Sequence, residues 1–271
     1  MKYRLLSAII GDICGSSYEC CPELDYNKVN LTHIANTYTD DTICTIAIAD
    51  ALLNPCTTGV FDFTHYLRKW YFMYPDCGYG KNYKTWASNV QSPIQYSWGN
   101  GAAMRISPIG FYAKSIGEAR ILAHEACLNS HAHLEGIKGA IAVAESVFRM
   151  KESYDFWVVE KNIMLDYYPE YRYKDLNKIK ETYKFDSSCQ GTVPIAMLCF
   201  NDSVDYKDCI TKAISMGGDA DTLAAIAGSI MGAHLQELPE DLVEYALSKL
   251  TPEMIDIIER FDLLIDEREQ D

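Results

Sequence analysis

The chain has 271 residues, of which 48% are hydrophobic, and its formal net charge of −14 accompanies an isoelectric point near 4.8. A chain of this size can bury a full hydrophobic core without stabilising disulfides or structural metals. We expect one domain covering residues 1–271. So acidic a surface repels nucleic acids and anionic membranes, which disfavours both as partners.

The hydrophobic pattern predicts helices along almost the whole chain, without alternating strands and helices, and therefore an all-α protein. Two segments do not fit a helix. Residues 75–101 contain four glycines and two prolines, which predicts a long ordered loop of the kind that often carries function, and residues 168–188 read as a surface connection. Helices are expected at residues 5–13 (ended by Gly15), 41–53, 61–73, 115–128, 134–150, 155–168, 193–199, 206–216, 222–234, 240–250 and 253–265.

Targeting signals and disulfides are not expected. The apolar stretches fall far short of the ~20 residues that cross a bilayer, and the N-terminus has no clear cleavage site, so we expect a cytoplasmic protein. The ten cysteines are scattered and form no Cys-x-x-Cys pair. We interpret them as reduced residues of the core.

Two consecutive aspartates open the helix that follows Thr39. Asp40 and Asp41 lie between the hydroxyls of Thr39 and Thr42. One carboxylate in this position is a common helix cap, favoured by the helix dipole, but two between threonines exceed that need. Taken alone, the tetrad supports a cap and a ligand site equally well.

A second acidic pair follows two glycines. Asp219 and Asp221 would face different sides of a helix body, so they converge only in a loop or a first turn, for which Gly217 and Gly218 give freedom. The small and apolar residues 223–228 predict a buried helix, and carboxylates at its mouth need a cation. Because neither lysine nor arginine occurs from there to residue 235, a metal is the expected partner.

The two pairs together indicate the kind of metal. Aspartates and threonine hydroxyls are hard oxygen ligands, which select Mg²⁺, Mn²⁺ or Ca²⁺ over zinc. Four negative charges match two divalent ions, and a two-metal centre can activate water and orient substrate oxygens.

Three other features have both a structural and a functional interpretation. The segment Gly99–Arg105 offers backbone N–H groups to an anion, and Trp98 before it either stacks on a base or packs in the core. Glu19 is either a solvated acid or a catalyst. His131 and His133 form a His-x-His pair, but a third nitrogen or sulfur ligand at suitable spacing is missing, so hydrogen bonding or packing is expected rather than zinc.

In combination, six motifs resemble the ADP-ribosylglycohydrolases, which include the dinitrogenase reductase-activating glycohydrolase and the serine-linkage ADP-ribosylhydrolases. The resemblance implies a compact all-α orthogonal helix bundle with a binuclear Mg²⁺ or Mn²⁺ centre. The motifs follow the family's order between about residues 5 and 235, and are Gly11-Asp12…Glu19, Tyr38-Thr39-Asp40-Asp41-Thr42, Gly78-Tyr79-Gly80, Gly99-Asn100-Gly101-Ala102-Ala103-Met104-Arg105, Ser130-His131 and Gly217-Gly218-Asp219-Ala220-Asp221-Thr222.

The resemblance also implies roles by position. Glu19 matches a mobile-loop glutamate that serves in acid–base catalysis in the serine-linkage branch, with Asp40 and Asp41 as the next candidates. His131 matches a histidine near the distal ribose. The positions that match metal ligands are Thr39, Asp40, Asp41, Asp219, Asp221 and Thr222, and those that match the diphosphate- and adenine-binding loop are Ser97, Trp98, Gly99 and Asn100.

The chain departs from the family pattern at three positions. Trp98 replaces a tyrosine of the serine-linkage branch, Ser130 replaces a threonine, and Ala220 replaces an aspartate. Position 98 stays aromatic, so stacking is expected to survive. The second metal site varies within the family, so the changes at Ser130 and Ala220 leave the expected metal ligands in place.

The resulting hypothesis is a metal-dependent hydrolase that removes ADP-ribose from a protein side chain or a small adduct by cleaving the C1″ glycosidic bond. The expected partner is therefore an ADP-ribosylated protein or small molecule, bound by a monomer. An ADP-ribose-binding or crystallin-like relative without activity is the alternative, and retention of every matching ligand position disfavours it. A third interpretation, a binuclear phosphohydrolase, is disfavoured because the sequence lacks the histidine-rich ligand sets expected of many such sites. The linkage cleaved, through arginine, serine or another group, is left open by the sequence.

Overall fold

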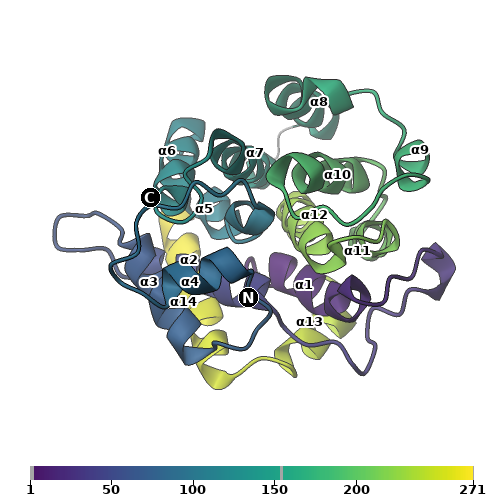
Figure 1. The fold of residues 1–271 in the computed structure, drawn as a ribbon. Helices are drawn as coiled ribbons and strands as arrows, with labels where there is room; N and C mark the ends of the chain where they lie inside the picture. Colours follow the sequence, from purple (N-terminus) through teal and green to yellow (C-terminus); the bar gives the residue numbers. More distant parts are fainter. Residues whose placement is uncertain (1–2, 153–154, 271) are drawn as a thin grey trace.

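Helices make up the regular structure of this protein. The computed structural model describes residues 3–152 and 155–270, and in these residues it has one isolated β-bridge but no β-strand, which confirms the all-α prediction. The elements (Figure 1) are α1 (Leu6–Glu19), η1 (Tyr26–Lys28), α2 (Asp40–Leu53), α3 (Phe63–Met73), α4 (Lys81–Ala87), η2 (Asn100–Ala102), α5 (Ser107–Tyr112), α6 (Ile116–Cys127), α7 (Leu134–Lys151), α8 (Phe156–Tyr167), η3 (Pro169–Tyr171), α9 (Leu176–Lys180), α10 (Cys189–Asn201), α11 (Tyr206–Ser215), α12 (Ala220–Leu235), α13 (Glu240–Leu247) and α14 (Pro252–Gln270).

Helices α2 and α12 lie at the centre of the fold. Residues 41–52 of α2 and 220–233 of α12 are buried without interruption, as expected for helices that are apolar on all sides. Helix α12 packs against α1, α7, α10 and α11, and α2 packs against α1, α3, α5 and α14. The two acidic motifs therefore begin the two most enclosed helices of the molecule.

Glycines let α1 and α12 approach each other closely. A Cβ atom at Gly11 would lie 2.2 Å from a backbone oxygen of α12, and one at Gly15 would lie 2.5 Å from the Cα of Asp221. At the other end of α1, Ser7 meets Gly232, so the two helices are antiparallel. The first turn of α12 consequently lies beside the second half of α1.

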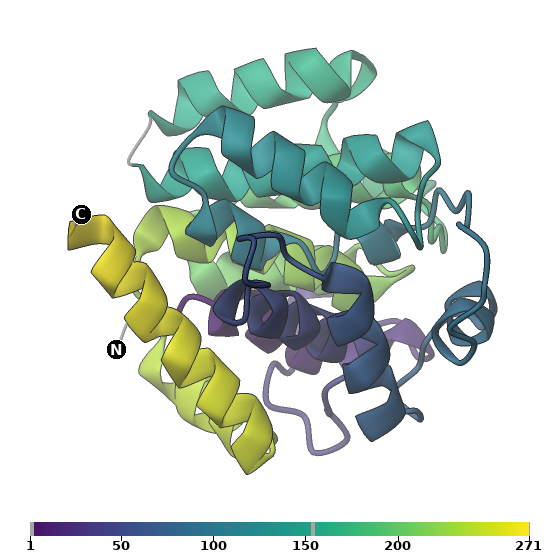
Figure 2. The same cartoon turned by 90° about the vertical axis from the view of Figure 1, so that its left-hand side faces the viewer.

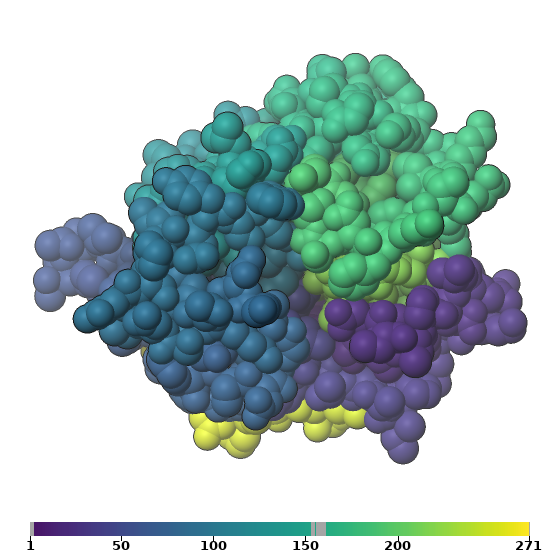
Figure 3. All heavy atoms as spheres, viewed as in Figure 1, coloured from purple at the N-terminus to yellow at the C-terminus, as the bar shows by residue number. Residues whose placement is uncertain are grey.

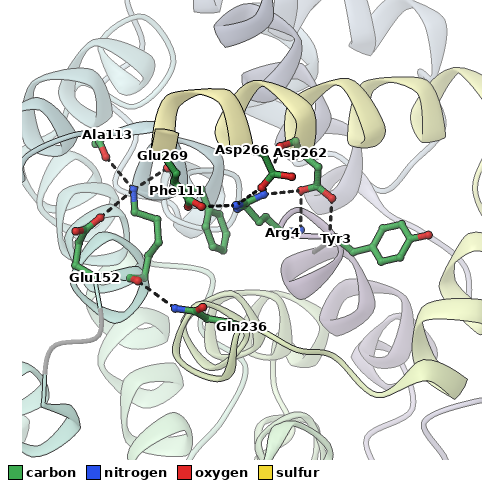
Figure 4. Close-up of polar contacts among 10 residues, drawn as sticks. Tyr3, Arg4, Phe111, Ala113, Glu152, Gln236, Asp262, Asp266 and Glu269 are labelled. Carbon is green, nitrogen blue, oxygen red and sulfur yellow. Dashed lines mark hydrogen bonds and ion pairs between the residues drawn. The ribbon is translucent and has the colours of Figure 1, made fainter. Parts of the chain in front are cut away.

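Helix α14 holds the start of α1 from the opposite side. The carboxylate of Asp262 accepts hydrogen bonds from the backbone N–H groups of Tyr3 (2.6 Å) and Arg4 (3.0 Å). The buried Arg4 guanidinium donates to Asp266 (2.7 Å) and Glu269 (2.9 Å), as Figure 4 shows. In Figure 2, α14 runs in yellow along one side of the molecule, where it also packs against α2.

Several predicted boundaries are wrong. Helix α1 does not end at Gly15 but continues to Glu19, because this glycine serves close packing rather than a helix cap. Helix α10 begins at Cys189, four residues before the predicted start, where the Ser188 hydroxyl caps it by accepting from the N–H of Gly191 (3.1 Å). Helix α14 runs past residue 265 to residue 270.

The two predicted connections contain short helices. Helix α4 lies within the predicted loop 75–101, anchored by the buried Trp86 and Ala87, and α9 lies within the predicted connection 168–188. Helix α5 has no counterpart among the predicted helices. These helices have five to seven residues, too few for a periodic hydrophobic pattern.

The helix lengths agree with the sequence patterns, but the prediction that the cysteines are core residues is wrong for four of them, since Cys20, Cys21 and Cys56 are exposed and Cys77 is half-buried. Within residues 3–152 and 155–270, no helix combines the length and apolar character needed to cross a bilayer. All ten cysteines are unpaired; those that are buried are Cys14, Cys44, Cys127, Cys189, Cys199 and Cys209.

Candidate active site

A buried aspartate of α1 fixes the start of α2. Asp12 accepts hydrogen bonds from the backbone N–H groups of Thr39 (2.9 Å) and Thr42 (3.1 Å) and from both threonine hydroxyls. Burial raises the pKa of Asp12, and these hydrogen bonds oppose that rise. Because a buried carboxylate without donors is costly, the four contacts tie α2 to α1. The sequence motif included Asp12 but gave it no role; its signal was a single acid within the apolar face of α1.

The first acidic pair lies in the first turn of α2. Thr39 caps the helix, since its hydroxyl accepts from the N–H of Asp41 (3.3 Å). Asp41 is buried, and its Oδ2 has no hydrogen-bond partner among the described residues. Asp40 is half-buried, and Gly78 lies so close to it that a Cβ there would be 3.3 Å from its Oδ1. Thr39 therefore caps the helix, and neither aspartate side chain is needed for the cap.

The second acidic pair depends on the two glycines before it. Gly217 and Gly218 adopt left-handed φ values of +74° and +69°, a use of the conformational freedom that the sequence analysis attributed to them. Asp219 then occupies the cap position of α12, and its Oδ2 accepts from the side-chain amide of Asn100 (2.8 Å). Asp221 follows in the first turn and is buried. Asn100 thus orients one of the four aspartates.

Both acidic pairs line one cavity of about 410 Å³. The space-filling view shows a hollow where the blue, green and purple parts of the chain meet (Figure 3). Of the predicted site residues, Trp98 alone lies outside this lining, in an adjoining cavity of about 320 Å³ that shares Ser97 and Gly99 with it. The predicted residues that line the main cavity are Glu19, Thr39, Asp40, Asp41, Ser97, Gly99, Asn100, His131, Asp219, Asp221 and Thr222.

Burial, together with neighbouring negative charges, raises the pKa values of four acidic groups in the cavity. Burial, followed by the charge of Asp12, raises the pKa of Asp40 to about 8. Burial and the neighbouring acids hold the pKa values of Asp41 and Asp221 well above their usual range. Burial, Asp219 and Asp12 also raise the pKa of Glu19. A cation in the cavity would let these groups ionise together.

The residues present fit a hard divalent cation. Asp41 Oδ2 is a buried oxygen without a donor, and the surrounding side chains offer carboxylate and hydroxyl oxygens. Nowhere in the described part of the chain do three His, Cys, Asp or Glu side chains already form a ligand cluster. A cation would therefore need oxygens from both helix starts, together with threonine hydroxyls or water.

Two basic side chains also line the cavity. Lys81 and the fully buried Arg105 come from α4 and from the segment after η2, far from the acidic motifs in sequence. Lysine and arginine are thus missing from the sequence around Asp219 but present in the cavity itself. Basic groups reach the site from other elements, beyond the reach of a local pattern.

The loop before η2 is held in place by the segment before α10. The backbone N–H of Asn100 donates to the oxygen of Ser187 (2.8 Å), and the N–H of Cys189 donates to that of Trp98 (2.9 Å). The Trp98 side chain is 52% exposed and its ring meets His133 edge-on at 5.4 Å between centroids. Trp98 is therefore not a core residue, which leaves stacking on a base as its interpretation.

The two histidines make the polar contacts expected of them. His131 is buried, with Nδ1 2.9 Å from the Ser130 hydroxyl. His133 caps α7 by accepting from the N–H of Glu135 at Nδ1 (3.1 Å). The Nδ1 atoms of both rings are thus used in hydrogen bonds.

The fold and the cavity define a class: helical proteins with an acidic, oxygen-lined cavity between two helix N-termini. A sequence profile of the ADP-ribosylglycohydrolase family matches residues 4–270, and the chain belongs to this family. This membership places it among the glycohydrolases of ADP-ribose, a family that depends on metal ions.

Individual relatives are similar at lower identity. The ADP-ribosylhydrolase ARH3 of Homo sapiens is 26% identical over 312 residues, covering 87% of this chain and 86% of the relative, and the Bos taurus protein of the same name is also 26% identical. An uncharacterized protein of Archaeoglobus fulgidus is 28% identical over 233 residues, covering 78% and 75%. A solved structure described as an ADP-ribosylglycohydrolase-related protein complex has the same fold, with a TM-score of 0.71, 19% identity and 97% of each chain covered.

Proposed function

We propose that this protein is a metal-dependent hydrolase that releases ADP-ribose from a modified protein side chain or a small ADP-ribosyl adduct by cleaving the C1″ glycosidic bond. The observation that carries the proposal is the meeting of two acidic helix starts in one cavity, with the buried Asp41 Oδ2 left without a partner. Family membership supports the reaction class, and the names of the ARH3 relatives support the kind of substrate.

The proposed metal ligands are the side chains of Thr39, Asp40, Asp41, Asp219, Asp221 and Thr222, around two Mg²⁺ or Mn²⁺ ions. When bound, these ions supply a polarised water and contacts for the ribose hydroxyls. Asn100 keeps Asp219 pointed at the cavity through its 2.8 Å hydrogen bond. Asp12 keeps both α2 aspartates in place through its contacts with Thr39 and Thr42.

Glu19 is the proposed proton donor and acceptor. Water adds its oxygen to C1″ as the bond to the leaving group breaks, and the departing oxygen or nitrogen needs a proton. The raised pKa of Glu19 favours its protonated form, which suits that task. The developing positive charge at C1″ is stabilised by the surrounding carboxylates.

The rest of the nucleotide is proposed to lie along Ser97, Trp98, Gly99 and Asn100. This loop separates the main cavity from the adjoining one, which Trp98 lines. The diphosphate would meet the loop and the adenine would stack on the exposed indole, with His131 facing the sugar. A two-part cavity of this shape suits a long ligand with a ring at one end.

The test is turnover of arginine- and serine-linked ADP-ribosyl peptides, with Mg²⁺ or Mn²⁺ or with EDTA, read by mass spectrometry. We expect free ADP-ribose with metal and no product with EDTA or in the Asp219→Asn variant. Asp256→Asn, at an exposed position of α14, is the matched control. Release of phosphate or AMP would instead indicate a phosphohydrolase, and binding without turnover would indicate a non-catalytic relative.

A further inference from the structure

A chain of hydrogen bonds leads from Arg105 through Ser130 to His131. The Arg105 Nη2 donates to the Ser130 hydroxyl (2.6 Å), and that hydroxyl lies 2.9 Å from Nδ1 of His131. All three residues are buried, and Arg105 is 0% exposed. Nη2 also lies 3.3 Å from the carbonyl oxygen of Ala126 near the end of α6. Arg105 is therefore anchored both to the end of this helix and to Ser130, which follows it.

The direction of each hydrogen bond follows from the chemistry of the groups. A guanidinium can only donate, so the Ser130 oxygen accepts from Arg105. The hydroxyl hydrogen is then available for Nδ1 of His131, the other hydrogen-bond partner of this hydroxyl among the described residues, and we assign Nδ1 as its acceptor. In a neutral imidazole one nitrogen accepts and the other carries the proton. The proton of His131 therefore lies on Nε2.

The surroundings keep His131 neutral. Burial, followed by the positive charge of Arg105, holds the pKa of His131 well below its usual range. A neutral ring with Nδ1 occupied has one remaining polar function, the Nε2–H group. Its direction of donation is consequently fixed before any ligand arrives.

The Nε2 edge faces two glycines and the cavity. A Cβ atom at Gly101 would lie 3.1 Å from Nε2, and one at Gly99 would lie 3.7 Å away, so any side chain there would crowd this edge. His131 lines the main cavity, and Nε2 makes no hydrogen bond within the described part of the chain. The donor is thus left for a ligand.

We propose that Arg105 and Ser130 are positioning residues that fix His131 as a one-way donor, through Nε2–H, to an acceptor oxygen of the ADP-ribosyl group. The identity of the ligand rests on the proposed function, whereas the tautomer is inferred from the contacts of Ser130 and His131 and does not depend on that function. A site built in this way favours a phosphate or ether oxygen at that point. A ligand group that only donates, such as an ammonium, is disfavoured.

The first experiment measures the tautomer without any ligand. Ring-¹⁵N NMR of the full chain should show His131 as the Nε2–H form from about pH 6 to about pH 8, with its signal identified by loss in His131→Gln. Ser130→Ala should remove this preference, and Ser130→Thr, which keeps a hydroxyl, should restore it. Because Arg105 is fully buried and its replacement risks the fold, Ser130 is the position to vary.

The second experiment measures ADP-ribose affinity by calorimetry with metal present. Ser130→Ala should weaken binding about tenfold, the size of one lost hydrogen bond, while Ser130→Thr stays within about twofold. A merely structural serine would lower the melting temperature of Ser130→Ala without changing the tautomer.

Two results would overturn the proposal: an Nδ1–H tautomer in the unsubstituted protein, or an unchanged tautomer in Ser130→Ala. The NMR measurement decides the proposal even for a chain that binds no ADP-ribose, a result that would count against the proposed function alone. Conversely, normal turnover together with an Nδ1–H ring would retain the proposed function and reject the positioning role.

Discussion

Glu19 differs from the nearby aspartates in where it lies on its helix. It is the last residue of α1 and its side chain is exposed, whereas Asp41 and Asp221 are buried in first turns. The expectation of a glutamate on a loop is therefore corrected: the loop begins one residue later, at Cys20. A side chain at a helix end next to a loop can change its direction without moving the metal-ligand candidates.

Replacement of Glu19 tests its proton-transfer role. We expect Glu19→Gln to lower kcat by about 10²–10⁴-fold, the usual contribution of a general acid–base group. ADP-ribose affinity and melting temperature should change little, because Asp219 and the Trp98 loop stay in place. Glu259→Gln, at an exposed position of α14, is the control. Near-normal kcat in Glu19→Gln would transfer the role to Asp40 or Asp41.

Trp98 is exposed at the mouth of the adjoining cavity, and its contact with His133 orients the ring. We expect Trp98→Ala to lose about 1–3 kcal/mol of ADP-ribose binding free energy, the range for base–aromatic stacking, and Trp98→Tyr to lose much less. Calorimetry of the three proteins measures both differences. Equal affinity in Trp98→Ala would show that the adenine lies elsewhere.

At the scale of helices, the site depends on how closely α1 approaches α12. Gly15 lies against the backbone of Asp221, so the two helices cannot stay at their present distance with a side chain there. The approach brings Asp12 and Glu19 of α1 near the acidic pair of α12, as their shared effects on pKa values indicate. The close packing of α1 against α12 therefore also determines the geometry of the site.

Gly15→Ala tests this connection. A Cβ atom 2.5 Å from the Cα of Asp221 must push the helices apart, and overpacking of this kind costs about 1–3 kcal/mol of folding free energy. We expect a lower melting temperature and loss of turnover together. The matched control is Gly117→Ala in the first turn of α6, where the nearest atom to a new Cβ, the hydroxyl of Ser115, is 3.8 Å away. That change should be neutral or stabilise by up to about 1 kcal/mol.

A buried acid joins three helices away from the cavity. Glu145 of α7 is fully buried and pairs with Arg120 of α6 (2.7 Å), Arg149 (2.7 Å) and the hydroxyl of Tyr167 of α8 (2.6 Å). Burial works against its ionisation, but the hydrogen bonds from these three partners outweigh it and lower the pKa of Glu145. Its contribution to stability is therefore present above its ordinary pKa and is lost as the pH falls through the lowered folded-state value.

Glu145→Gln should consequently lower the free energy of unfolding by about 3 kcal/mol at neutral pH, because it removes the buried carboxylate that pairs with Arg120 and Arg149. The difference from the unsubstituted protein should shrink in acid, below about pH 4. Asp256→Asn, which breaks an exposed pair with Arg260, should cost less than about 0.5 kcal/mol. Urea unfolding at several pH values measures all three proteins. A difference that does not depend on pH would exclude the ionised network.

At the scale of the whole molecule, the acidic cavity opposes folding until its charges are balanced. The two most buried helices both begin at this cavity, so repulsion among Asp40, Asp41 and Asp221 acts at the centre of the fold. The net charge of −14 supplies no excess positive charge to offset this repulsion. A bound divalent cation would therefore stabilise the molecule as well as complete the site.

Metal binding should raise the melting temperature. With Mg²⁺ or Mn²⁺ at 100 times its Kd, binding to the folded state adds about 2.7 kcal/mol, which corresponds to a rise of about 5–10 °C for a domain of this size. EDTA should reverse the shift. Asp41→Asn should abolish it, and Asp256→Asn should retain it. A melting temperature independent of metal in the unsubstituted protein would contradict the metal centre.

The sequence by itself determined the features that depend on neighbouring residues. Hydrophobic periodicity predicted the all-α class, and the two glycines before Asp219 indicated a loop or first turn, which the structure contains. The acidic tetrad at residues 39–42 was recognisable because a helix cap needs only one side chain. In the structure Thr39 supplies that cap. Each of these inferences uses residues that lie close together along the chain, which a linear pattern records.

Only the tertiary structure decided which distant residues share the cavity. Asp12 reaches the start of α2, Asn100 reaches Asp219, and Arg105 reaches His131 through a serine. The sequence also left Trp98 between core and surface, and placed the end of α1 at Gly15, because burial and close helix approach depend on elements far away along the chain. Local patterns set the identity of each element, and packing between elements sets the chemistry at their junction.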